Sequence, residues 1–193
     1  TYGNTYLDNS GTLELGGAVS EHDGIASGGE IIIIVDGAIN ITETITAKPE
    51  NPLAKGGITL QAEESSEPGR DITVASSATL ESSYSNIAIL AGDNITIELG
   101  SSLVADTTLE IFGDYQNDDA AGSSIGVDGI INGAVVHIAG DSDPDTITTT
   151  TLNQTGTTVI EGRDSTDIIS TTGTNTALTP VVIYGDIASL ELD

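Results

Sequence analysis

The chain has 193 residues, enough for one well-packed domain, and carries 30 acidic residues against 4 basic ones, giving a formal net charge of −26. That charge repels nucleic acid and anionic membranes, which excludes both as partners and leaves cations, basic partners or plain solubility. Cysteine, methionine and tryptophan are absent, so disulfides, thiol catalysis and cysteine-based metal sites are excluded.

Residues 1–29, which include the stretch "NTYLDNSGTLELGG", predict a partial first coil or an N-terminal cap or contact segment. The sequence starts at Thr1 with neither an initiator methionine nor a signal peptide, so we expect a processed protein or a piece of a longer one. No apolar run approaches the length of about 18 residues that a membrane-spanning helix needs, and membrane insertion is not expected.

One motif recurs over residues 30–193: an alternating apolar segment that ends in glycine, usually followed by aspartate. We call the last residue of each copy its anchor. The predicted anchors are Gly37, Ala62 in a degenerate copy, Gly92, Gly113, Gly140, Gly162 and Gly185. They are separated by 25, 30, 21, 27, 22 and 23 residues, which is typical of one irregular solenoid coil each.

Alternation within the motif predicts strands with one buried face. The residues two positions before the anchors are all aliphatic: Val35, Leu60, Leu90, Ile111, Ile138, Ile160 and Ile183. Those four positions before them are mostly aliphatic: Ile33, Ile58, Ala88, Leu109, Val136, Thr158 and Val181. Stacked coils would place equivalent side chains roughly 4.8 Å apart, so Ile111, Ile138, Ile160 and Ile183 are expected to form an internal ladder.

A second short strand is expected after each anchor, in "INITETI", "DITV", "NITIEL", "SIGV", "TITT", "DIIS" and "IASLEL", and a weaker third one in segments such as "SLVAD" and "GIING". Because the same motif returns with the same face apolar, the sequence favours an all-β fold, a parallel β-helix with coils of about 21–30 residues. A β-sandwich is the alternative, since it also has short strands and frequent turns.

The phrases "NSGTLELGGAV", "GDNITIELGSSLVADTTLEIFGDY" and "GDSDPDTI" resemble the degenerate repeats of very large bacterial surface proteins, the filamentous-haemagglutinin-like and repeats-in-toxin-like adhesins. This resemblance implies a right-handed β-helix outside the cell or on its surface, with adhesive or structural roles and often bound calcium.

The repeats-in-toxin calcium motif is G-G-x-G-x-D-x-U-x, with U a large apolar residue. Gly140, Asp145 and Ile147 match its first glycine, its aspartate and its apolar position, and Gly162, Asp167 and Ile169 match them again 22 residues later. The other two glycines are missing, because Asp141 and Asp143 stand there in the first copy and Arg163 and Ser165 in the second.

Calcium takes six to eight oxygen ligands, and two short loops offer several carboxylates each. The predicted calcium ligands are Asp114, Asp118, Asp119, Asp141, Asp143, Asp145 and Asp167. The alternative is that these are solvated turns whose aspartates hydrogen-bond to their own backbone.

The residue after the anchor is Asp93, Asp114, Asp141, Arg163 and Asp186 in successive coils. Stacked like charges repel each other, so Arg163 is expected to neutralise the aspartates on either side of it.

Signals for catalysis are weak. His137 is predicted to face outward from its strand and His22 to lie in an acidic turn, and no serine–histidine–acid set can be drawn. Three N-x-Thr sequons, at Asn40, Asn94 and Asn153, become glycan sites only in an organism that glycosylates.

The sequence favours a non-catalytic structural or adhesive module that builds an adhesin stalk, a surface layer or a filament. The alternatives are a calcium-dependent carbohydrate-binding domain, with glycans as partners, and a carbohydrate-active β-helix enzyme that uses two carboxylates. Because neither terminus offers a helix or a proline-rich plug, the coil ends are expected to meet more of a longer chain or another copy in a filament.

Overall fold

The computed structural model describes residues 3–16, 24–50, 56–63, 69–116, 121–150, 156–163, 166–172 and 180–185. These residues form strands and turns, with no helix among them, and so none that is long and apolar enough to span a membrane. The strands lie in three sheets, and every strand pair within them is parallel. The chain is therefore a parallel β-solenoid, as the recurring motif predicted, and not a β-sandwich.

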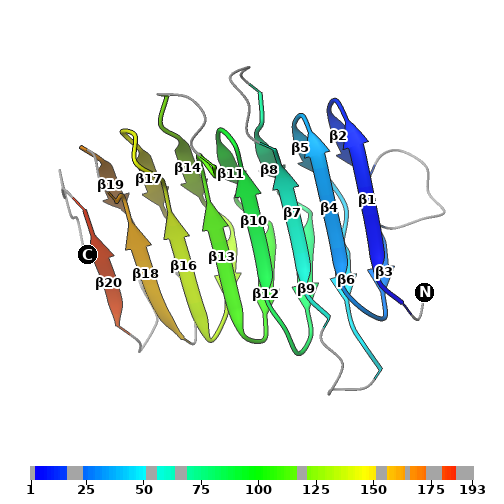
Figure 1. The fold of residues 1–193 in the computed structure, drawn as a ribbon. Coiled ribbons are helices and arrows are strands. Elements are labelled where there is room, and N and C mark those ends of the chain that lie inside the picture. Colours follow the sequence, from blue (N-terminus) through cyan, green and yellow to red (C-terminus); the bar gives the residue numbers. More distant parts are fainter. Residues whose placement is uncertain are drawn as a thin grey trace.

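Each sheet collects one strand from successive coils, side by side in chain order (Figure 1). Sheet A contains β1 (Thr5–Ser10), β4 (Ile31–Asp36), β7 (Ile58–Ala62), β10 (Ile87–Ala91), β13 (Thr108–Phe112), β16 (Val135–Ala139), β18 (Thr157–Glu161) and β20 (Val181–Tyr184). Sheet B contains β2 (Leu13–Leu15), β5 (Ile39–Ile41), β8 (Ile72–Val74), β11 (Ile95–Ile97), β14 (Ser124–Val127), β17 (Thr146–Thr149) and β19 (Ile168–Thr171). Sheet C contains β3 (Ile25–Ser27), β6 (Ile45–Ala47), β9 (Thr79–Ser82), β12 (Ser102–Ala105) and β15 (Ile130–Asn132).

These strands match the predicted segments closely. The predicted second strands lie in sheet B, except the last one, "IASLEL", which lies outside the described residues. The predicted third strands in "SLVAD" and "GIING" lie in sheet C. Residues 1–29 contribute one strand to each sheet, namely β1, β2 and β3.

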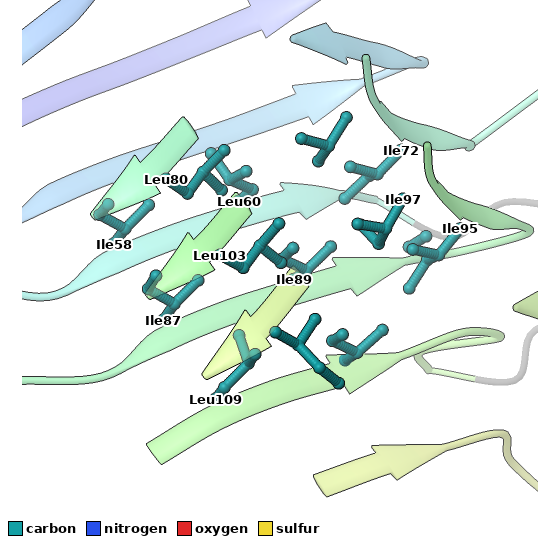
Figure 2. Close-up of a cluster of buried hydrophobic side chains, with 14 of the residues drawn as sticks. Ile58, Leu60, Ile72, Leu80, Ile87, Ile89, Ile95, Ile97, Leu103 and Leu109 are labelled. Carbon is teal, nitrogen blue, oxygen red and sulfur yellow. The ribbon is translucent and has the colours of Figure 1, made fainter. Parts of the chain in front are cut away.

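The interior is filled by aliphatic side chains from all three sheets (Figure 2). Leu60 and Ile89 of sheet A, Ile95 and Ile97 of sheet B, and Leu103 of sheet C all have no exposed surface. Alternating residues of each strand point inward, so stacking the coils removes one continuous apolar column from water. This column is the main source of stability that the described residues offer.

The predicted isoleucine ladder is confirmed. Ile111 pairs with Ile138, Ile138 with Ile160, and Ile160 with Ile183, each in register between adjacent strands of sheet A. The first three side chains have no exposed surface, and Ile183 packs against the core from its partly buried position.

The predicted register is wrong by one residue in β10. Ile89, not Leu90, pairs with Ile111 and points inward, while Leu90 pairs with Phe112 on the outer face. The anchor of this coil is therefore Ala91 and not Gly92. The error arises because Ile87–Ala91 is apolar at every position, so the sequence does not show which set of alternating residues is buried.

The register is also wrong, by two residues, in β4. Ile33 pairs with Leu60 and Val35 with Ala62, so Val35 and not Gly37 is the equivalent of the anchor Ala62. A shift of two residues leaves the buried face unchanged, and the period-2 pattern therefore cannot detect it.

Candidate functional site: an acidic corner and a surface cleft

A row of polar residues lies where sheet A turns into sheet B, one position before the strands β14, β17 and β19 and two positions before β11. The pairings of sheet B align its members in successive coils. We call this row the corner ladder; it consists of Asp93, Ser123, Asp145 and Asp167. Ser123, Asp145 and Asp167 are buried, with exposed fractions of 3%, 1% and 1%.

Each carboxylate of the corner ladder accepts a hydrogen bond from the backbone of the preceding coil. Asp93 Oδ2 accepts from the N–H of Arg70 at 2.7 Å. Asp145 Oδ1 accepts from the N–H of Ser123 at 2.6 Å and from its hydroxyl at 2.8 Å, and Asp167 Oδ1 accepts from the N–H of Asp145 at 3.0 Å. These bonds to charged acceptors connect the coils and satisfy backbone donors at the corner.

The anchor glycines make room for this ladder. A Cβ atom on Gly140 would overlap the carboxylate of Asp145, and one on Gly162 would overlap that of Asp167. The spacing that matched the calcium motif, a glycine followed five residues later by aspartate, is therefore explained here by packing within the corner.

The predicted calcium ligands are distributed as follows. Asp114, Asp145 and Asp167 are buried, Asp141 and Asp143 are partly exposed, and Asp118 and Asp119 lie outside the described residues. In the part of the chain that the structure describes, no three histidine or acidic side chains form a group that could hold a metal ion. Calcium binding stays a prediction.

Burial raises the pKa of the Asp145 carboxyl above its ordinary value. Hydrogen bonds from the backbone and side chain of Ser123 oppose this shift, and the neighbouring charge of Asp167 adds to it. The folded protein therefore binds a proton at Asp145 more readily than the unfolded chain does.

This shift predicts a pH dependence of stability. Because the folded state holds the extra proton, the contribution of Asp145 to the free energy of unfolding is most favourable at acidic pH and is lost as the pH rises through the raised pKa. Asp145→Asn keeps an acceptor for Ser123 but cannot ionise. We expect its unfolding free energy, measured with urea at a series of pH values from the ordinary aspartate pKa of 3.8 upward, to fall less steeply with pH than that of the wild type.

Asp143→Asn is the control, because it removes one negative charge from the same turn at a partly exposed position. It measures how much of the change comes from reduced charge repulsion alone. If Asp145→Asn and Asp143→Asn changed the slope equally, burial of Asp145 would not be its cause.

A cleft of about 350 Å³ opens beside this corner, and its lining comes from three coils. We call it the Arg163 cleft; its side chains are those of Phe112, Tyr115, Gln116, Asp141 and Arg163. Arg163 Cζ lies 5.4 Å from the centroid of the Phe112 ring, and its Nη1 lies 3.8 Å from Asp141 Oδ1. Arg163 thus lies beside one of the two aspartates it was predicted to neutralise, and the other, Asp186, is outside the described residues.

His137 lies next to this cleft on the outer face of sheet A, where the alternation predicted it. Its ring meets the Phe112 ring edge-on, at 4.9 Å between centroids and 83° between planes. Its Nε2 lies 3.2 Å from Glu161 Oε2, but the angles do not make this contact a hydrogen bond. His22 lies outside the described residues.

A second cleft, of about 440 Å³, lies near the sheet C side of the solenoid. We call it the Lys48 cleft, after the basic residue in its lining, which also includes Glu81, Tyr84, Asp106 and Asn132. It has fewer aromatic groups than the Arg163 cleft, with Tyr84 alone.

Left-handed backbone is concentrated at these two clefts. Among the described residues, four that are not glycine have a positive φ: Tyr84 (70°), Asp114 (51°), Gln116 (98°) and Arg163 (66°). Tyr84 lines the Lys48 cleft, Gln116 and Arg163 line the Arg163 cleft, and Asp114 lies between its lining residues Gly113 and Tyr115. Backbone conformations of this kind are often found at binding sites.

Sequence reasoning missed a further set of contacts on the outside of the corner. Asn94 donates from Nδ2 to Asp71 Oδ1 at 2.9 Å, and its Oδ1 accepts from the N–H of Ser124, also at 2.9 Å. The sequon residue Asn94 thus connects three coils, whereas Asn40 is partly buried in β5 and Asn153 is outside the described residues. The sequence signal for these contacts was the polar residue at the first position of "DITV", "NITIEL" and "SIGV".

No family model, no curated protein and no solved structure matches this chain.

Proposed function

We propose that this chain is a non-catalytic structural module of an extracellular β-solenoid, one that builds a surface structure such as an adhesin stalk, a surface layer or a filament. The observation that carries the proposal is the parallel pairing that runs through sheet A from β1 to β20. Each coil serves as a template for the next, so the same pairing can extend the rod beyond either edge. The extracellular setting rests on the resemblance of the repeats to those of bacterial adhesins.

The edge strand β1 has the geometry for such an extension. In the described part of the chain it pairs with β4 alone, and the N–H groups of Thr5 and Gly11 bond to Glu30 and Asp36 at 2.7 and 2.8 Å. Alternate residues of a strand direct their N–H groups to the same side, so the N–H of Asp8 is directed away from β4. An incoming parallel strand would find this donor at the open edge.

The charge distribution supports growth along the axis over lateral association. A formal charge of −26 on 193 residues keeps the sides of neighbouring rods apart. Pairing at the coil ends brings charge together as well, but backbone hydrogen bonds and burial of the end of the apolar column oppose that repulsion. Added salt should therefore favour association.

The proposal predicts that Asp8→Pro blocks association end to end. The purified chain is expected to form larger species as its concentration and the sodium chloride concentration rise, measured by sedimentation and electron microscopy. Proline removes the outward N–H and puts its ring in the way of the incoming strand, while the bonds to β4 are kept. We expect association to weaken about tenfold or more, which corresponds to about 1.4 kcal/mol.

Asp8→Ala is the matched control, because it loses the same charge but keeps the N–H, and it should associate at least as well as the wild type. Far-UV circular dichroism checks that both variants fold. A wild-type chain that stays monomeric at every concentration and salt level would contradict the proposal.

A further inference from the structure

The Arg163 cleft differs in chemistry from the rest of this acidic chain. It holds one of only 4 lysine and arginine residues together with an amide, a carboxylate and two aromatic rings. Its volume of about 350 Å³ lies at the lower end of the range that small-ligand sites occupy, about 300–1,000 Å³. A few convergent polar groups beside aromatic walls are the usual make-up of such sites.

The guanidinium of Arg163 is positioned by its neighbours, but its N–H groups do not donate a hydrogen bond to Asp141. Phe112 supports it at 5.4 Å by a cation–π contact. The 3.8 Å separation from Asp141 Oδ1 is an ion-pair distance but is too long for a hydrogen bond. Asp141 thus supplies an acceptor beside a planar set of donors, and the two charges cancel.

The backbone here is unfavourable for the residues that occupy it. Arg163 has φ of 66° and Gln116 has φ of 98°, conformations in which glycine has no steric cost. A side chain other than glycine is sterically disfavoured in such a region. Two long polar side chains with this unfavourable backbone conformation line the same cleft. This indicates that a function of the cleft, and not the stability of the fold, accounts for their presence there.

We propose that the Arg163 cleft binds a neutral saccharide. Arg163 would donate to, and Asp141 accept from, adjacent hydroxyl groups of the sugar, with Gln116 as a further partner and Tyr115 against the apolar C–H face of the ring. An anionic ligand is disfavoured, since Asp141 already balances Arg163 and the chain as a whole carries a charge of −26. The site lies on the side of the rod, so this proposal does not depend on pairing between coil ends.

The test is a titration of the folded chain, followed by two-dimensional NMR and by ligand-observed saturation transfer. The probes are glucose, galactose, mannose, N-acetylglucosamine, cellobiose and lactose, with glucuronate at matched ionic strength as the anionic probe. We expect at least one neutral probe to bind and to shift the signals of Gln116, Asp141 and Arg163.

The decisive variant is Arg163→Gly. Glycine removes the guanidinium and relieves the left-handed conformation, so the melting temperature should stay within a few degrees of the wild-type value while affinity falls at least tenfold. Tyr84→Gly makes the same kind of change in the Lys48 cleft, where φ is 70°, and should leave binding unaltered.

Three outcomes would overturn the proposal: no neutral probe binds, glucuronate binds in their place, or Arg163→Gly binds as tightly as the wild type. Loss of binding in Tyr84→Gly with retention in Arg163→Gly would place the sugar in the other cleft and would equally refute it.

Discussion

Replacing Ile138 with aspartate is expected to unfold the protein. Its side chain has no exposed surface and stacks between Ile111 and Ile160 in the ladder of sheet A. The substitution removes about 1.5–3 kcal/mol of apolar burial and puts an unpaired carboxylate into the column. A total of several kcal/mol is a large part of the 5–15 kcal/mol by which a typical domain is stable.

Ile168→Asp is the matched control, because Ile168 lies in a strand of sheet B and is 50% exposed. Thr150→Asp, just beyond β17, is a second control, and both are expected to change the free energy of unfolding by less than about 1 kcal/mol. Urea denaturation followed by far-UV circular dichroism measures all three. Small and equal effects at Ile138 and Ile168 would mean that the register described here is incorrect.

Gly156→Ala is expected to have the next largest effect, from a single added methyl group. A Cβ atom at Gly156 would overlap the carbonyl oxygens of Ala134 and Gly133, both in the backbone of the preceding coil. Backbone atoms cannot rotate away as a side chain can, so the two coils would have to separate locally. We expect a loss of about 3 kcal/mol in the free energy of unfolding.

Gly126→Ala tests whether this loss comes from the close approach and not from glycine itself. At Gly126, in β14, the nearest atom to an added Cβ is the carbonyl oxygen of Ile95 at 4.0 Å. Alanine there should be neutral or stabilise by up to about 1 kcal/mol, by restricting the unfolded chain. Equal losses in both variants, measured by thermal and urea denaturation, would rule out the contact with Ala134 as the cause.

The sequence was sufficient to predict the coils but only part of their register. Where polar and apolar residues alternate clearly, as around Ile138 and Ile160, the predicted stacking is the observed one. In β10 every residue is apolar, and in β4 a shift by two residues preserves the buried face, so both registers were wrong. The registers of these two strands are determined by the backbone pairing. That pairing depends on the geometry of the corners between strands, which the pattern of polar and apolar residues does not encode.

The candidate site was harder to predict. Gly140 and Asp145 have the same spacing in a calcium loop and in a packed corner, and only the close approach of the glycine to the carboxylate distinguishes the two. The Arg163 cleft requires residues from three coils, so no local motif could reveal it. The sequence did offer one signal, since Phe112 is the single phenylalanine and lies directly before an anchor, where the coils stack.

The corner ladder also bears on how long such a protein can become. Its hydrogen bonds join residues 22 to 24 positions apart, at the three coil-to-coil steps that they bridge. Closing a new coil costs the entropy of one loop of about 21–30 residues. Because that cost grows only with the logarithm of the loop length and does not depend on the length of chain already folded, it is similar for every coil. Gene duplication could lengthen the rod coil by coil without making the last coil slower to form than the first.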